Sequence, residues 1–67
     1  MITQQSQLTT LFMSPQEFYR KHSLSQEAMA DLLAVNTRTV QRWLSGERNP
    51  SRSAERAIAL VDALLQE

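Results

Sequence analysis

The sequence contains no cysteine, only one glycine and two prolines, and its hydrophobic residues form no long continuous run. Without cysteine, neither disulfide bonds nor thiolate metal sites can form. The first ten residues carry no basic side chain and are not a signal peptide, and nothing later is apolar for long enough to span a membrane. We therefore expect a cytoplasmic protein.

Patterns of catalytic residues are missing as well. His22 is the only histidine, and no second metal ligand or nucleophile stands near it in the sequence, which leaves it a helix-end or surface role. Glu17, Glu27 and Asp31 are scattered over helix surfaces, and no glycine-rich loop could hold a phosphate. We expect no metal, no cofactor and no enzyme activity.

The formal net charge is zero, because seven basic side chains balance seven acidic ones. A neutral domain at first argues against nucleic acid, since a basic surface is the usual electrostatic feature of a nucleic-acid-binding domain. The basic residues are nevertheless concentrated: between Asn36 and Arg52, Glu47 alone opposes Arg38, Arg42, Arg48 and Arg52. This distribution predicts weak non-specific binding to nucleic acid with a modest salt dependence.

The 67 residues support one small all-α domain, since the sequence shows no strand-like alternation and no internal repeat. A first helix is expected from Pro15 to about His22, with Ser14 as its N-cap. A last helix is expected from about Ser51 or Arg52 to Leu65. Its apolar residues recur at helical spacing and predict one core-facing side made of Ala54, Ala57, Ile58, Val61, Leu64 and Leu65.

The N-terminal segment is rich in Gln, Thr and Ser, so we expect residues 1–13 to form a flexible arm and residues 14–67 to form the domain. Leu8, Leu11 and Phe12 are spaced as on a helix. A short N-terminal helical turn, which would be a fifth helix covering the core or a partner chain, therefore remains an alternative.

The stretch from Ser25 to Ser45 predicts two short helices joined by a tight turn. In its first half Ser25 is a good N-cap, and one stripe faces inward through Ala28, Met29, Leu32 and Leu33. In its second half Asn36 or Thr37 starts a new helix with an apolar side made of Val40, Trp43 and Leu44. So short a turn predicts a steep crossing of the two helices. Trp43 is expected in the core.

The chain resembles the Cro and phage-repressor type of helix-turn-helix domain over roughly Ser14 to Leu65. The resemblance rests on Leu24-Ser25-Gln26-Glu27, Ala30, Val35, Thr39-Val40-Gln41-Arg42-Trp43 and Gly46-Glu47-Arg48-Asn49-Pro50-Ser51. It implies a compact four-helix, lambda-repressor-like fold. Ser23 and Ala34 stand where the family commonly has glycine. Leu44 replaces a residue that is polar or acidic in many members, and we expect it to pack on the last helix.

The resemblance also implies a DNA-binding surface. The expected base-reading residues are Thr37, Arg38, Gln41 and Arg42, and the expected phosphate contacts are Gln26, Asn36, Thr39, Ser45, Arg48 and Arg52. Other readings remain open: Arg38 and Arg42 could be a solvated helix face, and Arg48 or Arg52 could pair with Glu47 or Glu55.

These features favour a sequence-specific regulator of transcription that binds double-stranded DNA. A small repressor acting as a homodimer on a pseudo-palindromic operator is the leading hypothesis, since a single module of this size buries little surface on DNA. The dimer surface would come from the last helix, the loop before it or the arm. The alternative is a protein-interaction module, such as an antitoxin or accessory subunit, which the neutral net charge would suit.

Overall fold

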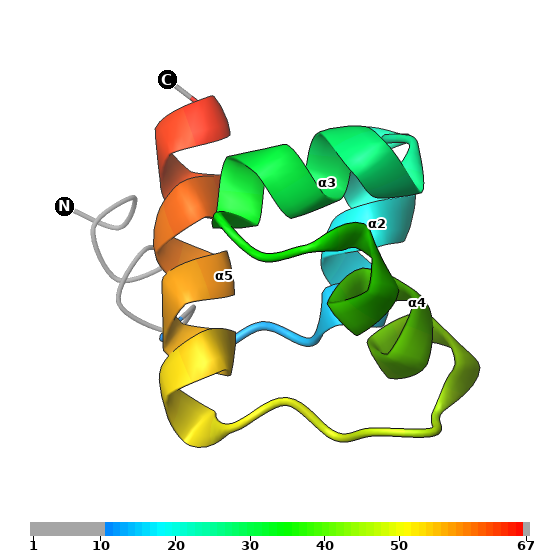
Figure 1. Ribbon diagram of the computed structural model, residues 1–67. Coiled ribbons are helices and arrows are strands. Elements are labelled where there is room, and N and C mark those ends of the chain that lie inside the picture. The colour runs from blue at the N-terminus through cyan, green and yellow to red at the C-terminus, as the bar shows by residue number, and fades with distance from the viewer. Residues whose placement is uncertain (1–10, 67) are drawn as a thin grey trace, which may run out of the picture.

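A computed structural model describes residues 11–66, and within this range the chain forms four helices and no strand. The helices are α2 (Pro15–His22), α3 (Gln26–Leu33), α4 (Thr37–Ser45) and α5 (Arg52–Leu65). In Figure 1, α5 stands along one side of the molecule, α3 runs across its upper part, and α2 and α4 lie on the side away from α5. This arrangement confirms the expected all-α helix-turn-helix fold.

Each helix begins at a polar residue whose side chain accepts a hydrogen bond from a free backbone N–H group of the first turn. The acceptor–donor distances are 3.1 Å at Ser14, Ser25 and Ser51 and 2.9 Å at Asn36. Because these caps are local signals, the sequence predicted all four helix starts correctly. Of the two residues proposed to start α4, Asn36 and Thr37, the N-cap is Asn36.

The turn between α3 and α4 is closed by Ala34, which has the left-handed backbone conformation (φ 59°, ψ 41°). The N–H group of Ala34 donates to the carbonyl of Asp31 at 3.2 Å, and that of Val35 donates to the carbonyl of Ala30 at 3.0 Å. This pair of bonds is a Schellman motif, which usually contains glycine at the left-handed position. Alanine therefore takes the role of the family glycine without disrupting the turn.

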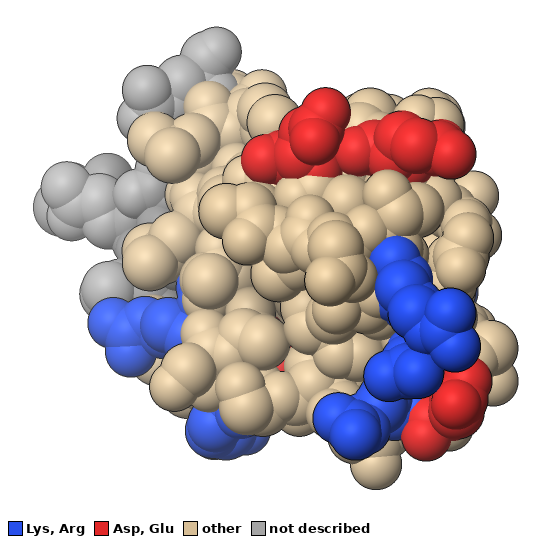
Figure 2. Space-filling view, in the orientation of Figure 1, with Lys and Arg blue, Asp and Glu red and all other residues tan. Residues whose placement is uncertain are grey.

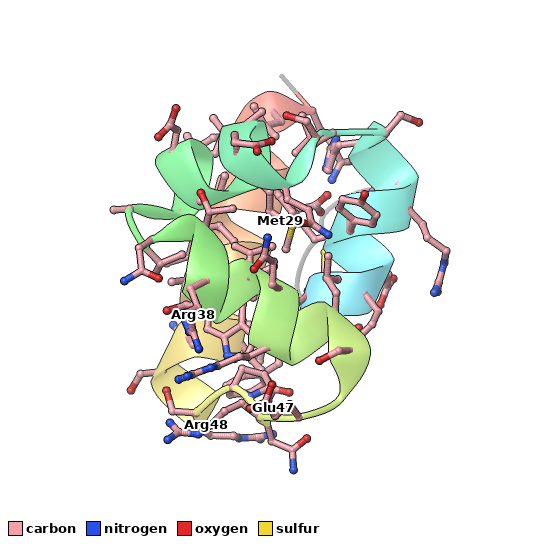
Figure 3. The ribbon with its side chains drawn as sticks, turned by 45° about the vertical axis from the view of Figure 1, so that its right-hand side comes forward. Met29, Arg38, Glu47 and Arg48 are labelled. Atoms are coloured by element: carbon pink, nitrogen blue, oxygen red, sulfur yellow. The ribbon has the colours of Figure 1, made fainter. Side chains whose placement is uncertain are left out.

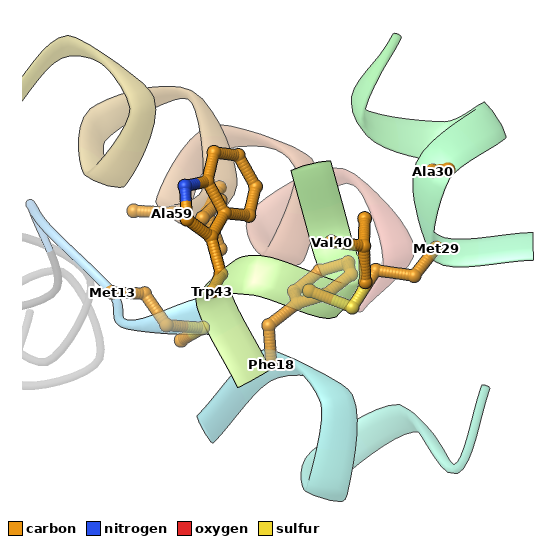
Figure 4. Packing of buried hydrophobic residues seen from close by; sticks show 8 residues of the cluster. Met13, Phe18, Met29, Ala30, Val40, Trp43 and Ala59 are labelled. Atoms are coloured by element: carbon orange, nitrogen blue, oxygen red, sulfur yellow. The ribbon is translucent and has the colours of Figure 1, made fainter. Parts of the chain in front are cut away.

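The core is built from all four helices and from the segment before α2. Figure 4 shows Phe18, Met29 and Val40 packed together near the centre, with Trp43 close to Ala59. Each large apolar side chain buried in this way stabilises the fold by about 1.5–3 kcal/mol. The buried hydrophobic residues are Met13, Phe18, Met29, Ala30, Val40, Trp43, Ile58 and Ala59, and partly buried Leu33 and Leu44 pack against them.

The predicted inner face of α5 is wrong in part. Ile58 is buried and Ala54 and Val61 are partly buried, as expected, but Ala57, Leu64 and Leu65 are exposed. The helix is rotated so that Ala59 and the carboxylate of Asp62 face inward instead. The short side chain of Ala59 lets α5 pack closely on the core, and residues at the end of α2 provide hydrogen bonds for the buried carboxylate. Leu32 of α3 was likewise expected inside and is 40% exposed.

The predicted boundary of the arm at residue 13 is too late. Met13 is only 3% exposed, and its N–H group donates to the carbonyl of Glu55 at 3.1 Å. The guanidinium of Arg52 lies over the ring of Phe12, 3.7 Å from its centroid. The domain therefore includes Phe12 and Met13, whereas residues 1–10, with the expected turn around Leu8, lie outside the described residues.

Candidate nucleic-acid interface

The exposed face of α4 is defined by the residues that anchor the helix. Val40 and Trp43 are buried, so the side of the helix opposite them faces solvent. Arg38, Gln41 and Ser45 lie at the middle of this side and are exposed. Thr37 and Arg42 flank it and are partly buried. The four predicted base-reading residues therefore share one side of one helix.

The side chains of Asn36 and Thr39 make hydrogen bonds within the protein at the start of α4. The side-chain oxygen of Asn36 accepts bonds from the backbone N–H group of Thr39 at 2.9 Å and from its hydroxyl at 3.0 Å. These bonds fix the first turn of α4, whose positive end favours an anion. Both residues thus shape a predicted phosphate contact. The Asn36 oxygen and the Thr39 hydroxyl proton bond to each other, whereas the side-chain NH2 group of Asn36 takes no part in this pair.

Gln26 is the first residue of α3 and is partly buried. Ser25 caps the helix before it, so Gln26 stands where the free N–H groups and the positive end of the helix dipole lie. This position suits the predicted phosphate contact.

The loop after α4 folds back on the end of the helix. The N–H group of Arg48 donates to the carbonyl of Arg42 at 3.2 Å, and the hydroxyl of Ser45 donates to the same carbonyl at 3.2 Å. Figure 3 shows Arg38 and Arg48 extending from the same side of the molecule, with Glu47 beside the end of α4. The structure therefore brings Ser45 and Arg48 together with the predicted base-reading residues.

Arg52 lies on a different helix from the predicted base-reading residues. It starts α5, stacks on Phe12, and lies 3.9 Å from the carboxylate of Glu55. Figure 2 shows the basic side chains in two groups, one over α4 and its following loop and another beside the start of α5. Arg52 thus begins another helix than the predicted set on α4, and the expected alternative of an ion pair with Glu55 is present.

Acidic side chains border the basic group on α4. Figure 2 shows acidic atoms in a band over α3, which carries Glu27 and Asp31, and a further acidic group beside the basic side chains near the end of α4. Close to phosphate, carboxylates oppose binding, so only part of this surface can approach a nucleic acid favourably. The neutral total charge is therefore the sum of an acidic surface over α3 and a basic surface over α4.

Two residues at the end of α4 have contacts that the sequence did not indicate. The side-chain amide of Gln16 in α2 donates to the carbonyl of Trp43 at 2.7 Å, which ties the last turn of α4 to α2. Glu47 places Oε2 3.9 Å from Nε of Arg42, whereas the sequence suggested Arg48 or Arg52 as its partner. These contacts join segments whose spacing only the fold determines, so no local pattern could reveal them.

A buried ion cluster lies away from α4, between the ends of α2 and α5. Asp62 is 1% exposed and accepts hydrogen bonds at 2.7 Å from Nε2 of His22 and at 3.2 Å from Nζ of Lys21. His22, for which a helix-end or surface role was predicted, ends α2 but is partly buried and also contacts the ring of Phe18. This cluster holds the two helices together and has no direct connection with the predicted interface.

Comparison with known families gives a match over most of the chain. A family model described as helix-turn-helix matches residues 16–64, which is more than half of the chain. No curated protein and no solved structure matches the chain significantly. Within residues 11–66, no group of three or more His, Asp or Glu side chains is placed to hold a metal ion, and no helix is both long and apolar enough to cross a membrane.

Proposed function

The chain belongs to the Cro and C1 type of helix-turn-helix family, whose members are DNA-binding regulators of transcription, and we propose that it is a small sequence-specific repressor. The exposed side of α4 carries this proposal: Arg38 and Gln41 are exposed on a helix that Val40 and Trp43 hold against the core. An α-helix of this kind fits the major groove of DNA.

On this proposal α4 supplies the sequence information. Thr37, Arg38, Gln41 and Arg42 contact base edges, and an arginine that pairs with O6 and N7 of guanine discriminates against other bases by about 1–3 kcal/mol. The phosphate contacts come from residues around the two helix starts and the loop after α4, and they set the position of the protein without reading sequence. They are Gln26, Asn36, Thr39, Ser45 and Arg48, with Arg52 at the edge of the site.

We further propose that the repressor binds a pseudo-palindromic operator as a homodimer. A single domain of this size makes few contacts, and two copies on half-sites about 34 Å apart would double them. The outward side of α5 supports pairing, because Leu60 and Leu64 are 57% and 67% exposed. Together with Ala57 they follow the alternating spacing of three and four residues that is typical of paired helices.

Selection of binding sites from random double-stranded DNA, followed by gel-shift titration, tests the proposal. We expect enrichment of one sequence with two-fold symmetry, and loss of binding when Arg38 and Arg42 are both replaced by alanine with circular dichroism unchanged. The double variant Arg20→Ala, Arg56→Ala removes the same charge outside α4 and serves as the control.

Two results would overturn the proposed function. One is that no sequence is enriched over bulk DNA, and the other is that the two double variants lose affinity equally. Either result would favour the alternative of a protein-interaction module, such as an antitoxin or accessory subunit, for which the exposed leucines of α5 would be a binding surface.

A further inference from the structure

Glu47 is the acidic residue that approaches the basic group on α4. Its carboxylate lies 3.9 Å from Nε of Arg42, and the side chains of Glu47 and Arg42 are 67% and 36% exposed. Both therefore remain accessible to a molecule that binds this face. The position is notable because a carboxylate next to a phosphate-binding surface opposes the binding of DNA.

The backbone places Glu47 there. Gly46 has a left-handed conformation, with φ of 83°, and this turns the chain at the end of α4. The next bonds hold the turned segment: the N–H group of Glu47 donates to the hydroxyl of Ser45 at 3.4 Å, and that of Arg48 donates to the carbonyl of Arg42 at 3.2 Å. The carboxylate is thus brought beside Arg42 by three consecutive features of the loop.

Stabilisation of the fold does not account for this pair. An exposed ion pair of this kind contributes about 0–1 kcal/mol, and the loop is already held by its backbone bonds. The geometry has a clearer consequence for binding. At 3.9 Å the carboxylate attracts Arg42 by charge without a hydrogen bond, and it lies toward the Nε edge of the planar guanidinium, away from the two terminal nitrogens that pair with a guanine base.

A carboxylate at this position also affects the two modes of DNA binding differently. Binding to bulk DNA depends on attraction between basic side chains and phosphates, which the negative charge weakens. Binding to a specific site depends in addition on the orientation of Arg42, which the same carboxylate restrains. Specificity can be raised by opposing the wrong partner as well as by improving the right one.

We propose that Glu47 is a specificity-determining residue that orients Arg42 for base reading and weakens the binding of this face to bulk DNA. The inference rests on the proposed function, because it requires a preferred DNA sequence. Replacement of Glu47 should then reduce discrimination while leaving the fold intact.

The test compares the wild-type protein with Glu47→Gln, using the selected operator and an unrelated duplex at the same salt concentration. We expect Glu47→Gln to bind the unrelated duplex more tightly and to lose up to about fivefold in the ratio of the two affinities, since an exposed ion pair contributes at most about 1 kcal/mol. In operators with single base changes, the lost discrimination should fall on the base pair that Arg42→Ala also affects.

Glu55→Gln is the matched control, since it removes the same charge beside Arg52, also at 3.9 Å, at the start of α5. It should leave the affinity ratio unchanged. An unchanged ratio of the two affinities in Glu47→Gln would overturn the inference. If both duplexes bind more tightly by the same factor, Glu47 acts only through its bulk charge. If the wild-type protein selects no sequence, the proposed function itself fails; if it selects one and Glu47→Gln keeps the ratio, the inference alone fails.

Discussion

Asp62 carries a buried negative charge in a domain whose core is otherwise apolar. Its carboxylate is bonded by His22 and Gln66 at 2.7 Å and lies 3.0 Å from Nζ of Lys21. Burial alone would raise the pKa of Asp62, but the hydrogen bonds from His22 and Lys21 and their charges outweigh it and lower the pKa below its ordinary value of 3.8. The ionised carboxylate is therefore favoured in the folded protein.

Replacing Asp62 by asparagine should destabilise the fold. The variant keeps the size of the side chain but loses the charge-assisted bonds to Lys21 and His22, so we expect the free energy of unfolding at neutral pH to fall by about 1–3 kcal/mol. Urea denaturation followed by circular dichroism measures the change. Asp31→Asn, at an exposed position of α3, is the control, and equal effects of the two variants would contradict a structural role for the buried cluster.

The titration of the Asp62 carboxylate should also be visible in the pH dependence of the free energy of unfolding. The lowered pKa means that the folded state releases the proton of Asp62 at a lower pH than the unfolded chain, where an aspartic acid titrates at about pH 3.9. The stabilisation is fully present above that value and is lost as the pH falls through the folded pKa. Denaturation curves recorded between neutral pH and about pH 3 should therefore show wild type and Asp62→Asn converging as the solution becomes acidic. Curves that stay parallel would refute this assignment.

At the scale of the elements, two helices end at non-glycine residues in the left-handed conformation. Ala34 closes α3 with φ of 59° and Ser23 closes α2 with φ of 52°. This conformation is unfavourable by about 1–2 kcal/mol for a residue with a Cβ atom. Glycine would remove that strain, although it also increases the entropy of the unfolded chain.

We expect Ala34→Gly to raise the free energy of unfolding by about 0.5–1 kcal/mol, seen as a higher thermal midpoint. Ser23→Gly should act in the same direction for the same reason. Ala63→Gly, at an exposed position inside α5, is the opposite control and should lower stability by about 1 kcal/mol. Destabilisation by Ala34→Gly would show that the turn between α3 and α4 is not strained.

The helices themselves were predictable because their signals are local. Ser14, Ser25, Asn36 and Ser51 each cap a helix within three residues, and this fixed the starts of all four. The inward face of α5 was not predictable, since its apolar residues form two stripes and local spacing cannot choose between them. That choice depends on Asp62 meeting Lys21 and His22, about 40 positions away in the sequence.

The candidate site was likewise predictable from the sequence only in part. Periodicity of Val40 and Trp43 predicted the side of α4 on which Arg38 and Gln41 are exposed. It could not show that Gln16 holds the end of α4 or that Glu47 faces Arg42, because these contacts arise from the packing of α2 and from the path of the loop. The sequence thus located the surface, and the fold determined which residues restrain it.

At the scale of the whole molecule, the rotation of α5 has a further consequence. Turning Ile58, Ala59 and Asp62 inward leaves Leu60 and Leu64 on the outer surface. Exposed leucines next to each other on one helix face lose contact with water if a second copy covers them, at about 25 cal/mol per Å² of apolar area. For a chain of 67 residues with a limited core, this gain would add to stability as well as to DNA affinity.

We expect the double variant Leu60→Gln, Leu64→Gln to abolish dimerisation without changing the net charge of the DNA-binding face. Sedimentation equilibrium over a range of concentrations should show a monomer–dimer equilibrium for the wild type and a monomer for the variant. The variant should bind a half-site as tightly as the wild type but gain little from the full operator, because the second copy no longer adds to binding. Leu32→Gln, on the exposed side of α3, is the control and should dimerise normally. A wild-type protein that stays monomeric at all concentrations, or a double variant that dimerises like the wild type, would exclude pairing through this face of α5.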